Sequence, residues 1–260
     1  MPTRNKKLYI TVSVALLSGL LSLPSNANSG APITFLAQDS QPKYFFSKKR
    51  LEGLCIDIYR ALEVKLAKKQ IKVEYPTQFM PIKRIFSLVE TEPQAVFCGA
   101  AKSASRELRF NFTTIPAYPV NYVLATHRDN TVAPNSFEQI QQGDYTIGAF
   151  YGTSSAGEMK QVLGEHRVND SFTDLDMAMK LLGTPPYRLQ YFYYHDIGLH
   201  YIVKRSSLPL KVLPIKFTSK QHWLIYSKLL APAQAEALEQ AMVELKKEGK
   251  LDKIIKQYSN

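Results

Sequence analysis

The sequence predicts an α/β protein with largely parallel sheets, arranged as one large domain or two modest lobes. Short apolar β runs alternate along the chain with amphipathic helical patterns. One of these runs, residues 95–100, is apolar throughout, which is typical of a central buried strand. Without its leader, the 260-residue chain is still long enough to bury a full core.

The first 27 residues have the composition of a secretory signal peptide. Arg4, Lys6 and Lys7 form a cationic head, residues 8–23 are apolar, and small residues precede the cleavage position. The alternative is a retained membrane anchor, which the short and interrupted apolar run disfavours. We therefore expect a cleaved leader at 1–27 and an exported protein in the periplasm.

Before Pro119 the expected elements follow an alternating order. Ile58, Leu62 and Leu66 recur one turn apart and indicate a helix. Pro81 has the first-turn position of a second helix. The predicted strands are 33–38, 71–77 and 95–100, and the predicted helices are 55–69 and 81–91.

After Pro119 the pattern restarts. Ser136 has the position of a helix N-cap, and Gly183 with Pro185 is expected to stop a later helix. The chain ends in a predicted helix-turn-helix unit. The predicted strands are 120–127, 145–150 and 188–196, and the predicted helices are 136–142, part of 151–164, 175–183, 231–249 and 250–258.

The charge balance is basic but not concentrated. The formal net charge is +11, and removal of the leader with its three positive charges leaves +8. The lysines are spread along the chain, and no zinc-finger spacing or aromatic RNA-binding motif accompanies them, so nucleic acid is not an expected partner. A small anionic ligand is compatible with this charge.

The two cysteines, Cys55 and Cys98, both lie in the mature part of the chain. In an oxidising compartment a disulfide is the expected state, and closing this loop would stabilise the fold by about 4 kcal/mol. The alternative is a pair of buried, reduced thiols. Neither the cysteines nor the five histidines have metal-ligand spacing, so no metal is expected.

Polar residues follow several predicted strands. In open α/β sheets, ligands bind beyond the carboxyl ends of strands, near exposed helix N-termini. Arg106 can hold a carboxylate by two parallel hydrogen bonds or can simply solvate a helix face. Thr153 and Ser154 can form an anion site or only an N-cap, because both use the same amide groups. The residues at strand ends are Asp39, Lys102, Arg106, Thr153, Ser154, His195 and Asp196.

Motifs of catalysis are missing from the sequence. The stretch GTSSAG differs from the G-x-S-x-G nucleophile elbow because residue 156 is alanine. No phosphate-binding G-x-x-x-x-G-K-[ST] motif occurs, and no spacing singles out a pair of acid and base carboxylates. We therefore expect neither enzymatic activity nor a cofactor.

Six pieces of the chain, in this order, resemble the family-3 extracellular solute-binding proteins, the periplasmic receptors of polar amino-acid uptake. The resemblance covers nearly the whole mature chain. The pieces are ITFLAQDSQPKYFF, EGLCIDIYRALEVKL, MPIKRIFSLVE, AVFCGAAKSASRELRFNFTTIPAY, IGAFYGTSS and ALEQAMVELKKEGKLDKIIKQY.

The resemblance implies a two-lobed periplasmic-binding-protein fold of type II, in which two hinge strands join lobes with mainly parallel sheets and flanking helices. The ligand binds in the cleft between the lobes. The lobe boundaries that it implies are 28–118 with 219–260 for the first lobe and 119–218 for the second.

The resemblance also implies roles for residues that match the family pattern. The stretch SASR makes Arg106 the match for the arginine that grips the ligand carboxylate. Asp39 matches an aspartate that helps to bind the ammonium group. Gly152 and Thr153 match a turn that donates hydrogen bonds to the carboxylate.

The sequence departs from the pattern at Ala101, where the family often has serine or threonine, and near His195 and Asp196, where an aspartate usually completes the ammonium site. The alignment does not choose between His195 and Asp196. These departures favour an anionic or aromatic carboxylate over a standard α-amino acid. Further candidate ligand-binding residues are Tyr44, Lys102, Ser154, Arg188 and Tyr194, and Arg84 could add positive charge.

The function that follows is a monomeric, non-enzymatic binding protein that delivers a small polar solute to a membrane ABC permease through transient contact. One alternative is a periplasmic dehydratase of cyclohexadienyl acids, which resembles this family in fold and would need His195 or Asp196 as a general acid. Another alternative is a sensory co-receptor.

Overall fold

The structure is a computed structural model that describes Met1 and residues 30–259. The predicted leader at 1–27 lies outside the described residues apart from Met1. The strands are β1 (Ile33–Leu36), β2 (Phe45–Ser47), β3 (Arg50–Glu52), β4 (Val73–Glu74), β5 (Ala95–Ala101), β6 (Asn111–Phe112), β7 (Tyr118–His127), β8 (Ile147–Phe150), β9 (Val168–Phe172), β10 (Tyr191–His195), β11 (Leu210–Val212) and β12 (Thr218–Tyr226).

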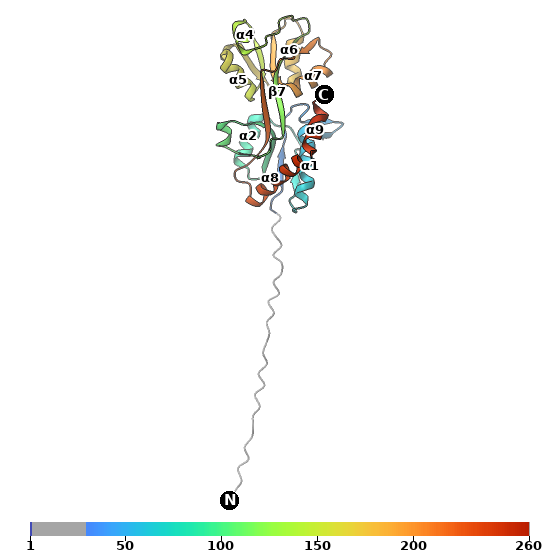
Figure 1. Cartoon of the computed structure of the whole chain (residues 1–260), viewed down its shortest axis with the longest axis vertical. Coiled ribbons are helices and arrows are strands. Elements are labelled where there is room, and N and C mark those ends of the chain that lie inside the picture. The colour runs from blue at the N-terminus through green and yellow to red at the C-terminus, as the bar shows by residue number, and fades with distance from the viewer. Residues whose placement is uncertain (2–29, 260) are drawn as a thin grey trace.

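The helices lie in two groups along the long axis of the folded part (Figure 1). We call the part with α1, α2, α8 and α9 the first half and the part with α4 to α7 the second half. The helices are α1 (Leu54–Ala67), α2 (Ile82–Thr91), α3 (Ala104–Glu107), α4 (Phe137–Gln142), α5 (Ser154–Leu163), α6 (Leu175–Gly183), α7 (Asp196–Arg205), α8 (Pro232–Lys247) and α9 (Lys250–Tyr258).

One curled sheet runs through both halves, with the strand order β4-β1-β5-β12-β7-β10-β8-β9. Pairing is parallel among β4, β1 and β5 in the first half and among β10, β8 and β9 in the second. Helices connect the consecutive parallel strands along the chain, as βαβ units require. The alternating α/β architecture predicted from the sequence is therefore confirmed.

Two long strands, β7 and β12, connect the halves and pair antiparallel with each other. The beginning of β12 pairs with β7, and its end pairs with β5 in the first half. The end of β7 pairs with β10 in the second half. The sequence reading assigned no element to β12, because its first residues are polar and only its last three are apolar and buried.

The predicted helix starts agree with the structure where a cap defines them. Ser136 accepts a hydrogen bond from the Gln139 amide at the start of α4, and Pro81 directly precedes α2. The strand predicted at 188–196 is shorter, because α7 begins at Asp196 without an intervening loop. The His195 side chain caps this helix by accepting from the Gly198 amide at 2.9 Å.

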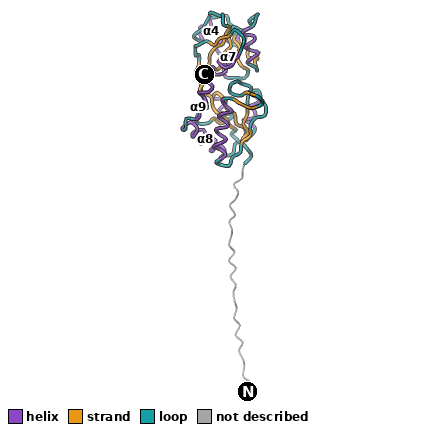
Figure 2. The backbone as a smooth tube through the Cα atoms, turned by 90° about the vertical axis from the view of Figure 1, so that its right-hand side faces the viewer, coloured by secondary structure: helices purple, strands orange, loops and turns teal. Residues whose placement is uncertain are grey.

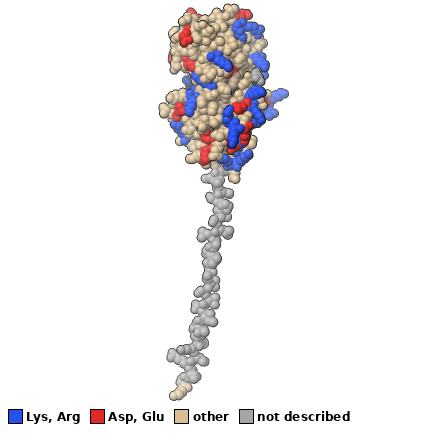
Figure 3. Space-filling model, in the orientation of Figure 1, with Lys and Arg blue, Asp and Glu red and all other residues tan. Residues whose placement is uncertain are grey.

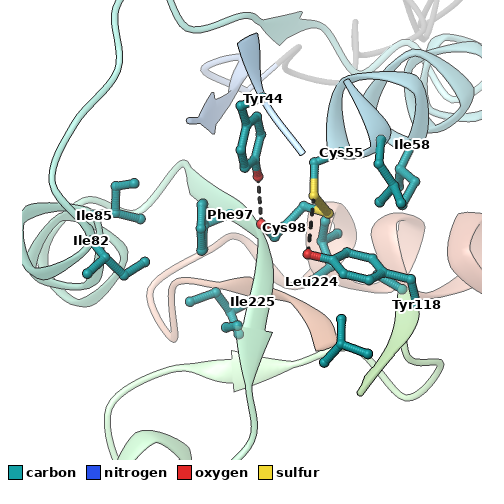
Figure 4. Close-up of a cluster of buried hydrophobic side chains, with 14 of the residues drawn as sticks. Tyr44, Cys55, Ile58, Ile82, Ile85, Phe97, Cys98, Tyr118, Leu224 and Ile225 are labelled. Carbon is teal, nitrogen blue, oxygen red and sulfur yellow. Dashed lines mark hydrogen bonds between the residues drawn. A yellow bond between two sulfur atoms is a disulfide. The ribbon is translucent and has the colours of Figure 1, made fainter. Parts of the chain in front are cut away.

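A disulfide joins Cys55 at the start of α1 to Cys98 in β5. The disulfide expected from the sequence is therefore present, and no free thiol remains among the described residues. Figure 4 shows the pair in the core, where the Tyr44 hydroxyl donates to the Cys98 carbonyl at 2.6 Å. Tyr59 is buried beside them and accepts from the Cys98 amide at 2.8 Å.

The tube view shows the C-terminus between α7 and α9, where the two halves meet (Figure 2). On the face shown in Figure 3, lysine and arginine are spread over both halves and mixed with acidic residues. No helix of the described chain is long and apolar enough to cross a membrane.

Candidate functional site

A small polar cavity lies between the halves, at the carboxyl ends of β1, β5, β8 and β10. This is where the topology of an open α/β sheet places ligands. The cavity measures about 30 Å³, roughly a tenth of the smallest typical ligand site. In the arrangement described, the cavity is too small to hold a molecule of amino-acid size.

Arg106 enters the cavity from the first half. Its guanidinium donates to the Ala101 carbonyl at 2.8 Å and stacks over the Phe86 ring, with its central carbon 4.6 Å from the ring centre. Burial lowers the pKa of Arg106, yet an arginine side chain stays charged at every physiological pH. Within residues 30–259 it has no salt bridge to a carboxylate, so its remaining donors can receive an anion.

Thr153 and Ser154 approach the cavity from the second half, at the N-terminus of α5. Thr153 is the N-cap, and its hydroxyl accepts from the Ala156 amide. The Ser154 hydroxyl lies 3.1 Å from the Tyr122 hydroxyl. The cap and the helix dipole leave this end of α5 positive, which favours an anion facing Arg106.

Lys43 is a second cation at the cavity, and its side chain is 3 % exposed. Its place follows from local structure, because the amides of Leu54 and Cys55 at the start of α1 donate to the Pro42 and Lys43 carbonyls. Only glycine fits at position 53, which has φ +128°, since a Cβ atom there would meet the Lys43 carbonyl oxygen at 2.3 Å. Burial lowers the pKa of Lys43 to about 7.

His195 contributes a hydrogen-bond donor to the same cavity. Its Nδ1 atom accepts from the Gly198 amide, so the neutral ring carries its proton on Nε2. The Nε2 atom is buried and has no hydrogen-bond partner within the described chain. Burial, and next the nearby charge of Lys43, lower the pKa of His195 well below its ordinary value, so the ring is neutral at neutral pH.

His222 also lines the cavity, but its ring nitrogens already have partners. They lie 3.3 Å from the Tyr118 hydroxyl and 3.3 Å from the Tyr122 hydroxyl. Burial, followed by the charges of Lys43 and Arg106, lowers the pKa of His222 well below its ordinary value. His222 is therefore a neutral residue that both tyrosines hold in place.

The cavity as a whole offers donors and positive charge. Gln38 adds a buried side-chain nitrogen without a partner in the described structure. Among the described residues that line the cavity, none is aspartate or glutamate. Because an unpaired buried donor costs free energy, an anionic ligand with several acceptor oxygens would satisfy groups that the protein alone leaves unsatisfied.

Asp39 lies outside this cavity, in an adjoining outer groove of about 230 Å³. Aromatic side chains line much of that groove, and Gln38 and Ile82 border both spaces. Burial first, and then Asp174 and Asp176 of the second half, raise the pKa of Asp39. Its carboxylate thus faces other carboxylates and does not complete the Arg106 site.

Four other residues predicted from the sequence also lie away from the cavity. Lys102 pairs with Glu107 at 2.9 Å on the surface. Tyr44 is fully buried in the core behind β5. Arg188 is exposed near the start of β10, at the opposite end of that strand from His195. Asp196 accepts from the Asn121 side chain at 2.7 Å and faces a different groove.

The structure brings five of the predicted residues to one place: Arg106, Thr153, Ser154, Tyr194 and His195. Gly152 borders it from the second half, where its turn packs on Ile82 of α2. Three lining residues, Lys43, His222 and Gln38, were not predicted from the sequence. The stretch QDSQPKYFF offered the only sequence signal for Lys43, because it follows the first strand.

A larger groove, of about 1140 Å³, lies between α7, β7 and the end of α9. It includes Asp196, Lys204 and Lys216 but none of the buried, unpartnered donors. We therefore assign the site to the smaller cavity between the halves. Across residues 30–259, no group of side chains is arranged to hold a metal ion.

Two strands that cross between α/β halves, with a polar cavity at the sheet ends, define a two-lobed binding protein. The comparison with protein families gives the same class: residues 33–260 match the bacterial extracellular solute-binding proteins, family 3. The chain belongs to this family. A search of curated proteins found no significant match.

Solved structures share the fold at low sequence identity. The GluR0 ligand-binding core in complex with L-glutamate is 15% identical, with a TM-score of 0.75 over 89% of this chain and 100% of that one. The arginine-, lysine-, histidine-binding protein ArtJ of Geobacillus stearothermophilus is 15% identical (TM-score 0.73; 87% and 94%). An ancestral amino acid-binding protein, a precursor of cyclohexadienyl dehydratase, is 20% identical (TM-score 0.72; 87% and 94%).

Proposed function

We propose that the protein captures a small, carboxylate-bearing solute between its two halves in the periplasm and delivers it to an ABC importer. The observation that carries the proposal is the partly buried Arg106 guanidinium, which has no acidic partner among the described residues and shares a cavity with the N-terminus of α5. Bidentate pairing of arginine with a carboxylate, completed by helix amides, is a strong and specific arrangement. Family membership and the amino acids named for the similar structures support a ligand of this class.

The mechanism we propose is a shift of population between open and closed arrangements. A ligand that contacts both Arg106 and Thr153 favours the closed state, which the permease would recognise. For this mechanism the lobes are 28–118 with 219–260 and 119–218, and β7 and β12 contain the hinge. The receptor acts as a monomer and meets the permease only transiently.

The decisive test replaces Arg106 with alanine. The change removes a buried, charge-assisted pair, so binding of the solute should weaken by several kcal/mol. Isothermal titration calorimetry would follow a thermal-shift screen of amino acids, organic acids and polyamines, because a ligand stabilises the fold according to its concentration and affinity. A change in affinity below about threefold, or ~0.7 kcal/mol, would show that Arg106 does not bind the ligand.

A dehydratase on the same fold is the second candidate function, and the presence of His195 in the cavity is the observation in its favour. That chemistry needs a general acid beside the carboxylate. Asp196 lies outside the cavity, and the lowered pKa of His195 makes it a neutral donor and a poorly populated acid near pH 7. Incubation with prephenate or arogenate, followed by ultraviolet absorbance, should give no product if the binding function is right.

A further inference from the structure

The site contains two separate cationic poles. The Arg106 pole consists of Arg106, Thr153 and Ser154, and Tyr122 joins it through its hydrogen bond to Ser154. The Lys43 pole consists of Lys43, His195 and Gln38. His222 lines the same cavity and is close enough to both that the charges of Lys43 and Arg106 lower its pKa. A ligand carboxylate bound at the Arg106 pole leaves the Lys43 pole without a partner.

The Lys43 pole is built from groups that nothing in the described chain satisfies. Lys43 is 3 % exposed and has no salt bridge or hydrogen bond from its ammonium within residues 30–259. The His195 Nε2 and Gln38 Nε2 atoms are buried without partners, in side chains that are 1 % and 4 % exposed. Three donor groups, one of them the Lys43 ammonium, are therefore available to acceptor oxygens.

An α-amino acid fits this pole poorly. Its ammonium group needs carboxylate or carbonyl acceptors, but the described lining holds no aspartate or glutamate. Asp39 lies in the outer groove beside Asp174 and Asp176, and Asp196 faces away. An ammonium beside Lys43 would instead meet a like charge at short range, in a place that water screens weakly.

We propose that the solute is a dianion: one carboxylate binds at the Arg106 pole, and a second acidic group, in place of an ammonium, binds at the Lys43 pole. The inference rests on the proposed function, because it concerns the same cavity. It adds the substrate class, a small dicarboxylate or a carboxylate with a second anionic group. In this proposal Lys43 and His195 select the dianion. They reject an amino acid because its ammonium group would find no acceptor beside them.

The test uses the mature protein, freed of bound solute by unfolding and refolding, in isothermal titration calorimetry. The probes are linear dicarboxylates of four to six carbons, the monocarboxylates of the same lengths, L-glutamate and L-arginine. We expect at least one dicarboxylate to bind about 100-fold more tightly than its matched monocarboxylate. We also expect L-glutamate to bind about tenfold more weakly than the five-carbon dicarboxylate, since it adds the ammonium.

The variant Lys43→Met separates the two poles. It should lower the affinity for the tightest-binding dicarboxylate by about 30-fold or more and change the affinity for monocarboxylates by less than about threefold. Lys228→Met is the matched control, because Lys228 is an exposed lysine of the first half, and it should leave both affinities unchanged. The proposal of a dianionic solute would be wrong if an amino acid or monocarboxylate bound as tightly as every dicarboxylate, or if Lys43→Met bound the dicarboxylate with unchanged affinity. Either result would leave the proposed carboxylate-binding function standing. Binding of no carboxylate at all would overturn the proposed function itself.

Discussion

Lys43 is the residue whose burial has the largest consequence for the ligand-free protein. Desolvation by burial disfavours the charged form of Lys43, and the neutral rings of His195 and His222 offer it no negative charge. Such a lysine lowers the free energy of unfolding at every pH at which the unfolded chain would hold it protonated. A bound anion would remove this cost, which makes the residue a link between stability and ligand binding.

The pH dependence of stability follows from this pKa. Lys43 titrates near pH 7 in the folded protein and near 10.5 unfolded, so between these values the unfolded chain binds more protons. The free energy of unfolding should therefore rise with pH across this window. Relative to wild type, Lys43→Met should be more stable by on the order of 5 kcal/mol at pH 6, at ~1.4 kcal/mol per pKa unit, and the difference should vanish toward pH 10.5.

Urea denaturation without ligand at pH 6, 8 and 10 measures this difference, and Lys228→Met controls for the loss of one positive charge. A difference that stays constant over the range would mean that Lys43 titrates as an ordinary lysine. His195 and His222 act in the same direction at lower pH. Their lowered pKa values remove stability as the pH falls below the unfolded value of about 6.5.

Three of the candidate residues that line the cavity, Arg106, Thr153 and His195, share one property: each is at or shortly after the end of a strand that the sequence makes plain. His222 did not have that signal, and Lys43 stands several residues beyond the end of the first strand. Lys43 is one of 33 basic residues, and nothing in its local sequence distinguishes it from an exposed lysine. His222 belongs to β12, whose polar beginning does not look like a strand.

At the scale of elements, the disulfide ties the start of α1 to the central strand β5. Both ends lie in the core beside Tyr44 and Tyr118 (Figure 4). The disulfide therefore holds the start of α1, whose amides bond the carbonyls at Lys43, against β5, the strand that precedes Arg106. Loss of the bond should loosen both poles of the site together.

The disulfide should stabilise the protein by about 4 kcal/mol, because it closes a loop across a sequence separation of 43 residues in the unfolded chain. The double variant Cys55→Ala/Cys98→Ala should lose this amount in urea denaturation. Wild type with a reductant should behave like the variant, while the variant itself should not respond to the reductant. Equal urea midpoints for oxidised wild type and the double variant would contradict the prediction.

At the scale of the whole molecule, side-chain contacts join the two halves. The Lys83 ammonium donates to the Tyr151 hydroxyl at 2.8 Å, and Ser40 lies 3.1 Å from the Tyr194 hydroxyl. Gly152 has φ +70°, and a Cβ atom there would lie 2.9 Å from Ile82. Glycine at this turn thus allows the second half to approach α2 closely.

The variant Gly152→Ala should disfavour closure and lower the affinity for the solute by about tenfold, or ~1.4 kcal/mol, without removing any side-chain contact to the solute. Gly249→Ala is the matched control, because Gly249 has φ +66° but nothing within 4 Å of the added atom. Both variants carry similar backbone strain, and only the first should bind more weakly. Small-angle X-ray scattering with saturating solute should show the same compaction for the control as for wild type. Equal affinities of the two variants for the solute would show that Gly152 does not act through closure.

The alternation of strands and helices, the helix starts at Ser136 and after Pro81, and the strand ends that carry Arg106 and Thr153 follow from the sequence by itself. They depend on local periodicity and capping, which neighbouring residues determine. The burial of Lys43, the position of β12 between β5 and β7, and the choice of His195 over Asp196 depend on the tertiary structure. Each arises from contacts between segments far apart in the chain, and a charged side chain carries no mark of its burial until those segments pack around it.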